Sequence, residues 1–412
     1  MATVKQTIVF IYIDGQPVPA GILTTSVDGR YTSSEFSYGS RYIERPDAIP
    51  VDPVTLPLPP PNRKDVVYRT KADFSVFNGI RDAGPDKWGR YLLDKKYPAS
   101  GLDEFDYIVS SGPDRVGALA FGANPQSGVG AWDGSKFIAA GPDRFPDLAQ
   151  IQRAVDNADD PGNPDFQKLL EYGPSLGGAR PKGTVIWNDR LYLAKLSLKS
   201  DGWNLCRGEF ATMKLAAACG MNVPPVAITE VLGKSVYLIE RFDRIGSSRI
   251  PFHSVLTMTD SHESDYGRHS YRDIVEAISR FSPDPDGDRK ELYRRMVFNI
   301  FCSNTDDHMR NHGMVYAGNG QWKLSPLYDV VPFPQNTNSW SLALHISDHG
   351  RSATVENVLA AAPGFGIRNT EANFVIEQIR DKFKNWRSHY AECGLTEQDI
   401  QKISSCFHIT DT

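Results

Sequence analysis

The sequence predicts an α+β fold in which a β-rich first part precedes a mostly helical second part. Two β-rich apolar stretches, residues 6–13 and 18–24, flank Asp14-Gly15, a pattern that favours a hairpin at the start of the chain. Beyond residue 245 the apolar residues recur with helical spacing, in residues 271–281, 291–301, 355–362 and 370–390. In the last segment they form one stripe made of Val375, Ile379, Phe383, Trp386 and Tyr390.

The composition is that of an ordinary globular protein. Among 412 residues, 40% are hydrophobic and 23% charged, and the net charge is -5, which argues against an autonomous nucleic-acid binder. The five cysteines are scattered without a C-x-x-C pair, which argues against a disulfide framework and a structural zinc site. The apolar run at residues 8–13 is too short for a membrane span and lacks a signal-peptide layout. We therefore expect a cytoplasmic protein that does not associate with membranes.

The remaining patterns predict three parts, residues 1–125, 126–245 and 246–412. The proline cluster from Pro46 to Pro61 predicts an extended surface loop. Two short helices are expected in residues 74–96, broken at Gly84-Pro85-Asp86, and a strand at residues 117–121 precedes a Gly-rich boundary. A β-lobe with one packed helix follows: strand 191–198, helix 205–219, strand 226–231 and strand 236–242.

Polar residues crowd the end of the helix predicted at residues 291–301. Asp306 is followed five positions later by Asn311, the spacing of the protein-kinase catalytic loop, in which the Asp accepts a hydroxyl proton and the Asn holds a metal ion. A hairpin signature around residues 318–320 then leads to a second acid, Asp329. Two carboxylates and an amide oxygen would suit Mg²⁺. The alternative is that Asp306 and Asp307 only form a turn at the end of the helix.

A phosphoryl-transfer site also needs backbone donors and cations for phosphates, and residues 173–182 can supply both. Gly177 and Gly178 allow main-chain N–H groups to approach a phosphate, and Arg180 and Lys182 add positive charge. The segment is not a Walker A loop, because Ala179-Arg180 stand where Lys-Ser/Thr is required. A plain Gly-rich turn is the alternative.

A lysine and a glutamate are expected to pair in the β-lobe. Alternation along the strand places Lys195 on the apolar face, where it needs a negative partner, and Glu209 lies on the apolar stripe of the next helix. The pair resembles the β3 lysine and helix glutamate of a kinase; an exposed lysine and a solvated glutamate are the alternative. The strand ending at residues 240–244 would be the hinge, its backbone binding adenine with Phe242 nearby, or simply a strand that ends in a salt-bridged surface.

Together these motifs resemble the HipA family of toxin kinases over nearly the whole chain. The residues that carry the likeness are S-L-G-G-A-R-P-K (175–182), Y-L-A-K-L (192–196), E-R-F-D-R (240–244), N-T-D-D-H-M-R-N-H (304–312) and L-Y-D-V-V-P (327–332). The resemblance implies a two-lobed protein-kinase-like fold. Its β-rich N-terminal lobe would include an extra N-terminal subdomain, and its C-terminal lobe would be mostly helical.

The resemblance also implies an activity: a serine/threonine protein kinase that uses ATP and Mg²⁺ and acts as a type II toxin that slows growth. Asp306 would be the catalytic base, Asn311 and Asp329 would hold metal, and Glu209 would pair with Lys195. The implied ATP contacts are Gly177, Gly178, Ala179, Arg180, Lys182, Lys195, Glu240, Phe242, His308, Asn311 and Asp329. Ser175 matches the serine that family members autophosphorylate, an event that ejects the phosphate loop and silences the kinase.

The partners implied by the resemblance are a small helix-turn-helix antitoxin of the HipB type and, through it, operator DNA. Family substrates include translation components such as an aminoacyl-tRNA synthetase, but nothing in the sequence identifies the target. One departure from the best-known loop pattern is Arg180-Pro181, where some members have Gln-Glu; Pro181 removes a backbone donor. Two other hypotheses are a non-catalytic nucleotide-binding partner or co-repressor of a DNA-binding antitoxin, and a small-molecule kinase of related fold. The presence of every expected catalytic residue type favours the protein kinase.

Overall fold

The chain divides into two compact units in the computed structural model. Unit 1 comprises Met1–Ala194 and Arg241–His253, and unit 2 comprises Lys195–Glu240 and Ser254–Thr412. The three-part organisation expected from the sequence stays a prediction. The structure describes residues 3–29, 31–60, 62–98, 101–133, 136–139, 145–158, 160, 162–172, 180–334 and 339–410.

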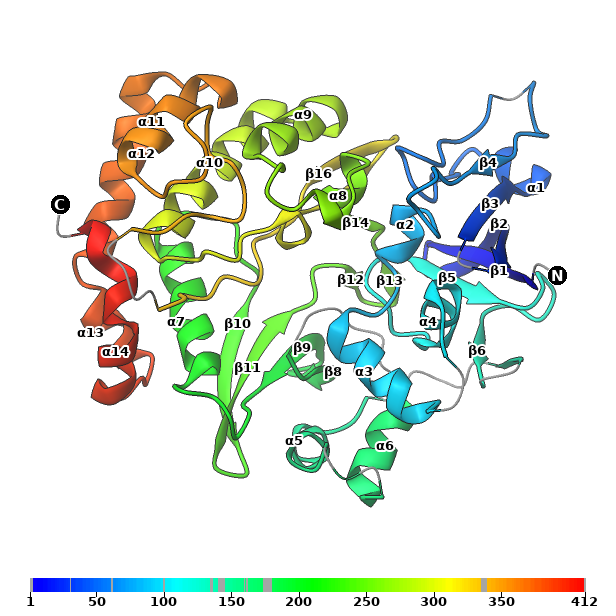
Figure 1. Cartoon of the computed structure of the whole chain (residues 1–412), viewed down its shortest axis with the longest axis horizontal. Helices are drawn as coiled ribbons and strands as arrows, with labels where there is room; N and C mark the ends of the chain where they lie inside the picture. The colour runs from blue at the N-terminus through cyan, green and yellow to red at the C-terminus, as the bar shows by residue number, and fades with distance from the viewer. Residues whose placement is uncertain are drawn as a thin grey trace. The chain divides into compact units, whose positions relative to one another are not determined.

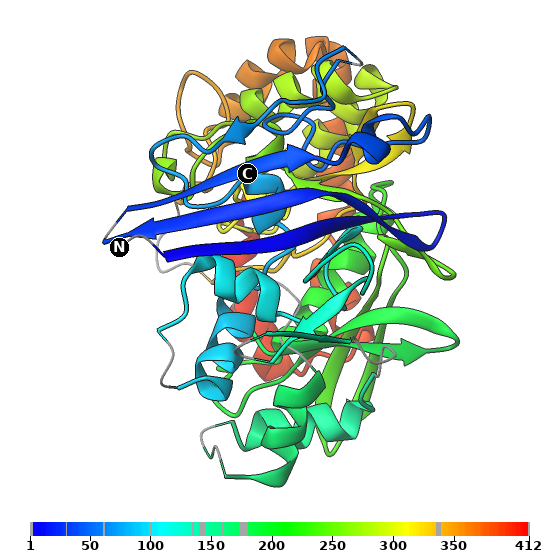
Figure 2. The same cartoon turned by 90° about the vertical axis from the view of Figure 1, so that its right-hand side faces the viewer.

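Unit 1 is built on an antiparallel sheet. Its strands are β1 (Thr3–Ile13), β2 (Gln16–Asp28), β3 (Tyr31–Tyr38), β4 (Tyr68–Arg69) and β5 (Leu119–Gly122), in the order β4-β3-β2-β1-β5. Figure 2 shows β1, β2 and β3 as long neighbouring strands. The predicted hairpin is confirmed, because Ile13 pairs with Gln16 across Asp14 and Gly15, which both have positive φ. The strand predicted at residues 117–121 is confirmed as β5.

The described residues of the proline-rich segment, 46–60, form no helix or named strand, as predicted, but they are not a surface loop throughout. Val51 and Leu56 are fully buried. The buried Tyr38 hydroxyl donates to the Leu56 carbonyl and accepts a hydrogen bond from the Val51 N–H at 2.8 Å. A buried backbone polar group needs such a partner. The tyrosine therefore lets this part of the loop enter the core, and the expectation of a surface loop was wrong there.

Short helices and hairpins complete unit 1. The two short helices predicted in residues 74–96 are confirmed as α2 and α3, which are separated by the predicted turn. The other elements appear in blue to green in Figure 1. The full set is α1 (Ser40–Ile43), α2 (Asn78–Arg81), α3 (Lys87–Lys96), α4 (Glu104–Ser110), β6 (Gly130–Trp132), β7 (Phe137–Ala139), α5 (Leu148–Asp156), α6 (Pro164–Tyr172), β8 (Lys182–Trp187), β9 (Arg190–Leu196, which ends in unit 2), β12 (Arg244–Ile245) and β13 (Ser248–Arg249).

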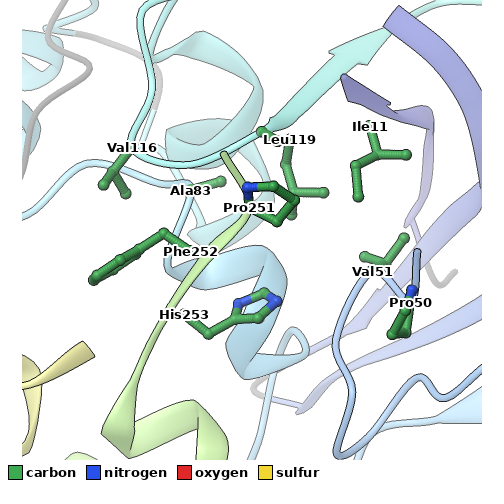
Figure 3. Close-up of a pocket in the computed structure, with 11 residues that line it drawn as sticks. Ile11, Pro50, Val51, Ala83, Val116, Leu119, Pro251, Phe252 and His253 are labelled. Carbon is green, nitrogen blue, oxygen red and sulfur yellow. The ribbon is translucent and has the colours of Figure 1, made fainter. Parts of the chain in front are cut away.

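A small cavity lies inside unit 1, between β1, β5, the proline-rich segment and residues 251–253 (Figure 3). Every residue that lines it is apolar or glycine except His253, whose Nδ1 lies 3.7 Å from a carboxylate oxygen of the buried Asp82. A ligand site normally adds several convergent polar groups to its apolar wall. The cavity is therefore part of the hydrophobic core.

Unit 2 begins with a strand–helix–hairpin arrangement and continues with helices, as predicted. Helix α7 (Leu205–Ala218) lies beside the long antiparallel pair β10 (Val226–Val231) and β11 (Lys234–Glu240) (Figure 1). The later elements are β14 (Phe252–Ser254, shared with unit 1), α8 (Val255–Met258), α9 (Tyr271–Phe281), α10 (Pro285–Phe301), β15 (Gly313–Gly318), β16 (Gln321–Leu324), α11 (Val355–Ala361), α12 (Asn369–Phe383), α13 (Trp386–Glu392), α14 (Glu397–Ile403) and the 3₁₀ turns η1 (Glu263–Asp265), η2 (Met309–Asn311), η3 (Ala362–Phe365) and η4 (Ser404–Thr410).

The C-terminal helical segment differs from the expectation in one respect. Residues 370–390 belong to two helices, α12 and α13, because the chain leaves helical structure at Lys384 and Asn385. All five residues of the predicted apolar stripe are nevertheless buried, and Phe407 stacks on Trp386 with ring centroids 4.0 Å apart. Among the described residues, no helix is both long and apolar enough to cross a membrane.

The sheet of unit 1 leads to a stability prediction at Gly21 on β2. A Cβ at this position would lie 2.3 Å from the Ser37 carbonyl oxygen and 2.5 Å from the fully buried Phe36 ring. Gly21→Ala should therefore lower the free energy of unfolding by about 1–3 kcal/mol, the usual cost of overpacking. Urea denaturation measures the change. Gly202→Ala, whose Cβ would meet nothing within 4 Å, is the control and should change it by less than about 0.5 kcal/mol. Equal losses would contradict the prediction.

Candidate active site

The centre of the candidate site in unit 2 is a buried lysine held by two carboxylates. Lys195 Nζ lies 2.6 Å from Glu209 Oε1 on α7 and 2.6 Å from Asp329 Oδ1. The side chains of Lys195 and Glu209 are 9% and 6% exposed, whereas that of Asp329 is 43% exposed. The structure thus brings the predicted lysine and glutamate together and adds the acid that follows the β15–β16 hairpin.

The electrostatics of this cluster keep the lysine charged. Burial by itself lowers the pKa of Lys195, but the charges and hydrogen bonds of Asp329 and Glu209 outweigh burial and raise that pKa above its ordinary value. A permanent ammonium group therefore lies between one buried carboxylate and one that faces solvent. An anionic ligand could approach it from the side of Asp329.

The loop after α10 presents one of its two neighbouring acids to solvent. In residues 303–312 only Asp306 is exposed, whereas Asp307 is 2% exposed. Partial burial and the charges of Asp329 and Asp307 raise the pKa of Asp306, while His308 acts in the opposite direction. Asp306 can therefore meet a substrate hydroxyl, and Asp307 cannot. The two acids are neighbours in the sequence but differ in their exposure to solvent.

Asn311 is oriented by the same loop. Its Nδ2 donates to the Asp306 carbonyl at 2.9 Å, so the amide oxygen is the side-chain atom left to bind a cation. Among the described residues, no three or more His, Cys, Asp or Glu form a group that could hold a metal ion. Mg²⁺, however, is commonly bound by one or two carboxylates together with substrate phosphates. The oxygen donors of Asp329 and Asn311 fit that kind of site.

The sequence model of the HipA-like C-terminal domain matches residues 174–387, just over half of the 412 residues, and includes all of these side chains. The chain belongs to the HipA-like family.

Named relatives agree with this assignment at low identity. A Sinorhizobium fredii protein named "Putative kinase Y4mE" is 24% identical over 336 residues, which cover 73% of this chain and 73% of that protein. A Haemophilus influenzae protein named "Putative kinase" is 27% identical over 199 residues, which cover 42% of this chain and 58% of that protein. The serine/threonine-protein kinase toxin HipA of Shewanella oneidensis is 26% identical over 185 residues, which cover 38% of this chain and 42% of the toxin.

A solved structure shares the fold over nearly the whole chain. The chain from the complex of HipA, HipB and operator DNA of Shewanella oneidensis aligns with a TM-score of 0.67 at 18% identity, covering 97% of this chain and 95% of that one. The predicted α+β, protein-kinase-like architecture of the HipA family is therefore confirmed. At this identity the likeness establishes the fold alone.

Several HipA-like site residues lie outside the part of the chain that the structure describes. These are Ser175, Gly177, Gly178 and Ala179 of the predicted phosphate loop. Arg180 and Lys182 are described, and Lys182 is the first residue of β8. Both are half-buried. Their contact with phosphate stays a prediction, as does the position of His308 beside the nucleotide.

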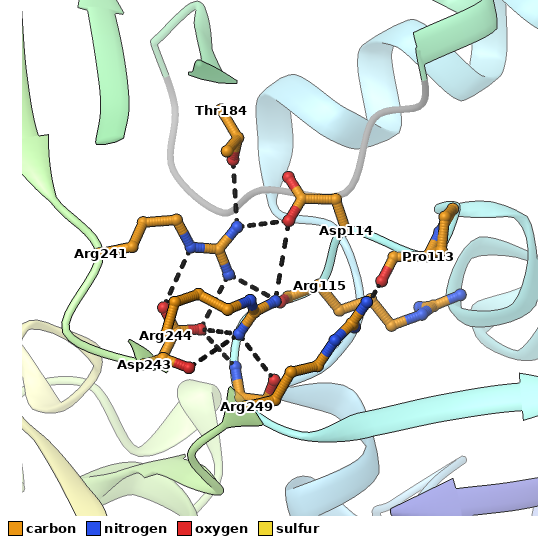
Figure 4. A network of polar contacts seen from close by, with 9 residues as sticks. Pro113, Asp114, Arg115, Thr184, Arg241, Asp243, Arg244 and Arg249 are labelled. Carbon is orange, nitrogen blue, oxygen red and sulfur yellow. Dashed lines mark hydrogen bonds and ion pairs between the residues drawn. The ribbon is translucent and has the colours of Figure 1, made fainter. Parts of the chain in front are cut away.

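The predicted hinge contains a buried ion-pair network within unit 1 (Figure 4). Arg241 contacts Asp114 and Asp243, and Arg244 also contacts Asp243, which accepts the N–H of Gly117 at 2.8 Å. Burial by itself raises the pKa of Asp243, but the two arginines hold it well below its usual range. The charges at the end of β11 therefore anchor residues 114–117 inside unit 1, which a salt-bridged surface would not do.

Two backbone N–H groups of the predicted hinge also have hydrogen-bond partners. The Glu240 N–H donates to the Pro225 carbonyl at 2.8 Å, and the Arg241 N–H donates to the Leu191 carbonyl at 2.9 Å. The N–H groups of these two residues are therefore not available for an adenine contact. The contacts proposed for Glu240 and Phe242 stay predictions.

Two residues that contact Asp307 were given no role in the sequence analysis. Tyr271, at the first position of α9, and His312 both bind the buried Asp307 carboxylate. The available signal was that His312 is the last residue of the N-T-D-D-H-M-R-N-H motif. Tyr271 lies more than thirty residues before its partner, so spacing could not reveal it.

The lysine cluster leads to a stability prediction. Lys195→Met leaves the Glu209 carboxylate buried beside an apolar side chain, which should lower the free energy of unfolding by about 3–5 kcal/mol at neutral pH. Burial without a cation disfavours the charged form of a carboxyl group. The loss should therefore be largest at neutral pH and shrink at acidic pH, where carboxyl groups are protonated. Urea denaturation at several pH values measures it.

Lys5→Met is the matched control. Lys5 also contacts two carboxylates, at 2.7 Å each, but its side chain and that of Asp103 are 27% exposed. Lys5→Met should lower the free energy of unfolding by no more than about 1 kcal/mol, as expected for exposed ion pairs. Equal losses in the two variants would contradict the prediction that burial of the Lys195–Glu209 pair decides the cost.

Proposed function

We propose that this chain is a serine/threonine protein kinase of the HipA toxin type, which transfers the γ-phosphate of ATP to a protein hydroxyl. The observation that carries the proposal is the double contact of the buried Lys195 with Glu209 and Asp329. In kinases a lysine–glutamate ion pair and a metal-binding aspartate must both be in place for phosphoryl transfer. The named relatives support the same class of activity.

The proposed roles follow from exposure and charge. Asp306, the exposed acid of the loop, accepts the proton of the substrate hydroxyl as the oxygen attacks the γ-phosphate. Lys195 binds phosphate oxygens with its permanent charge, and Glu209 keeps the lysine in position. Asn311 and Asp329 would hold Mg²⁺, which neutralises phosphate charge when bound. The further ATP contacts that we propose are those of Gly177, Gly178, Ala179, Arg180, Lys182, Glu240, Phe242 and His308.

We also propose regulation and partners of the HipA type. Ser175 would receive a phosphate from the same active site, and the added charge among the glycines of the loop would repel the γ-phosphate of ATP. A helix-turn-helix antitoxin would neutralise the kinase in the cytoplasm and carry it to operator DNA. The Shewanella HipA structure contains HipB and operator DNA, which supports this proposal. The growth-inhibiting target would be a translation component, for which an aminoacyl-tRNA synthetase is one candidate.

Transfer of labelled phosphate tests the proposed function. Purified protein, shown by mass spectrometry to be unphosphorylated, is incubated with Mg²⁺ and γ-labelled ATP, and the labelled residue is mapped. We expect label on Ser175, which Ser175→Ala abolishes. Asp306→Asn should slow labelling by about 10²-fold or more, because it removes the general base.

Asp348→Asn is the control for Asp306→Asn, because Asp348 is an exposed acid of unit 2 outside the candidate site. It should label at the wild-type rate. Absence of label from wild-type protein, with ATP still bound, would contradict the kinase proposal and support a non-catalytic nucleotide-binding partner of an antitoxin. Labelling that persists in Asp306→Asn would contradict the role of this acid.

A further inference from the structure

A chain of buried polar side chains lies behind the loop that carries Asp306. His312 Nε2 lies 3.0 Å from Asp307 Oδ1, and the Tyr271 hydroxyl donates to Asp307 Oδ2. Asn299 Nδ2 lies 3.5 Å from the Tyr271 hydroxyl, and Asn304 Nδ2 donates to Asn299 Oδ1 at 3.0 Å. Each of the five residues is at most 2% exposed.

This polar chain fixes the loop at its beginning, middle and end. Asn304 opens the loop and binds Asn299 on α10 through both its side chain and its N–H, the latter at 2.9 Å. Asp307 is held in the middle by Tyr271 of α9. His312 closes the loop, and its carbonyl accepts the N–H of Val255 at 2.9 Å. Buried groups that lose such partners cost free energy, so the network favours one loop conformation.

The protonation states of Tyr271 and Asp307 favour lasting hydrogen bonds to the Asp307 carboxylate. Burial raises the pKa of Tyr271 far above its ordinary value, and the neighbouring Asp307 raises it further, so the hydroxyl remains a donor. Burial by itself raises the pKa of Asp307, but His312 and the hydrogen bonds from both partners bring it below its ordinary value. A charged acceptor facing two donors makes strong hydrogen bonds.

Asp306 itself has no comparable restraint. Within the described part of the chain, its carboxylate makes no hydrogen bond or ion pair; only its backbone carbonyl does, with the N–H of His308 and the amide of Asn311. The position of this carboxylate is therefore set by the backbone of the loop. The side chain of the next residue, Asp307, is fixed by its hydrogen bonds.

We propose that Tyr271 and His312, acting through Asp307, are positioning residues that place Asp306 for proton transfer. This inference rests on the proposed kinase function. Neither residue is a catalytic residue, because both are fully buried and cannot touch a substrate. Their effect is to keep the exposed carboxylate within the narrow range of positions that a reacting hydroxyl requires.

Tyr271→Phe tests the proposal, because it removes one hydroxyl and keeps the ring. Tyr293→Phe is the matched control. Tyr293 is also fully buried and packs against the same Phe365, but its hydroxyl contacts the Val358 carbonyl, away from the loop. ADP formation from Mg²⁺ and ATP is measured at increasing ATP concentration for both variants and the wild type, together with Tm.

We expect Tyr271→Phe to lower the maximal rate about tenfold or more while the half-saturating ATP concentration changes less than about twofold. Tyr293→Phe should change neither by more than about twofold, although both variants lower Tm by a few degrees. Equal rates in the two variants, or a loss confined to the ATP concentration dependence, would overturn the proposal.

A second measurement does not depend on kinase activity. Amide hydrogen exchange in residues 304–312 should be faster in Tyr271→Phe than in the wild type and unchanged in Tyr293→Phe. Unchanged exchange in both variants would refute the proposal that Tyr271 holds this loop in place. If the wild type forms no ADP but exchange is still faster in Tyr271→Phe than in the wild type, the kinase proposal is refuted. The restraint of residues 304–312 by Tyr271 is then established independently of catalysis.

Discussion

The ammonium group of Lys195 is the charge on which the candidate active site depends. A buried cation needs a carboxylate partner, and Glu209 supplies a buried one at 2.6 Å. Asp329 contacts the same atom, and its side chain is 43% exposed. The cluster therefore combines a buried ion pair with a second acid that is partly open to solvent. This combination connects the strand β9, the helix α7 and the residues after the β15–β16 hairpin in one site.

The two neighbouring acids of the loop show how burial assigns different tasks to the same residue type. Asp307 is buried and accepts hydrogen bonds from Tyr271 and His312, so its carboxylate interacts with other protein groups and not with solvent. Asp306 is exposed and has a raised pKa, so its carboxylate can take part in proton transfer. Environments that push the pKa values of paired carboxylates apart are typical of acid–base sites.

The sequence predicted the parts of the site that depend on local spacing. Strand alternation and a helical stripe identified Lys195 and Glu209, and the Asp306–Asn311 spacing located the loop. It could not reveal Tyr271, because that contact joins segments far apart in the chain. The proline-rich segment was expected at the surface for a similar reason. Its burial depends on the distant Tyr38 hydroxyl, which satisfies backbone groups that a sequence pattern leaves unpaired.

The most direct test of the proposed nucleotide site is ATP binding with and without Mg²⁺, measured by calorimetry on the wild type and on Asp329→Asn. If Asp329 holds Mg²⁺ when ATP is bound, Mg²⁺ should tighten ATP binding to the wild type by about tenfold. Most of that gain should disappear in Asp329→Asn. Equal ATP affinity with and without Mg²⁺, in both proteins, would contradict the assignment of this cluster as a metal–nucleotide site.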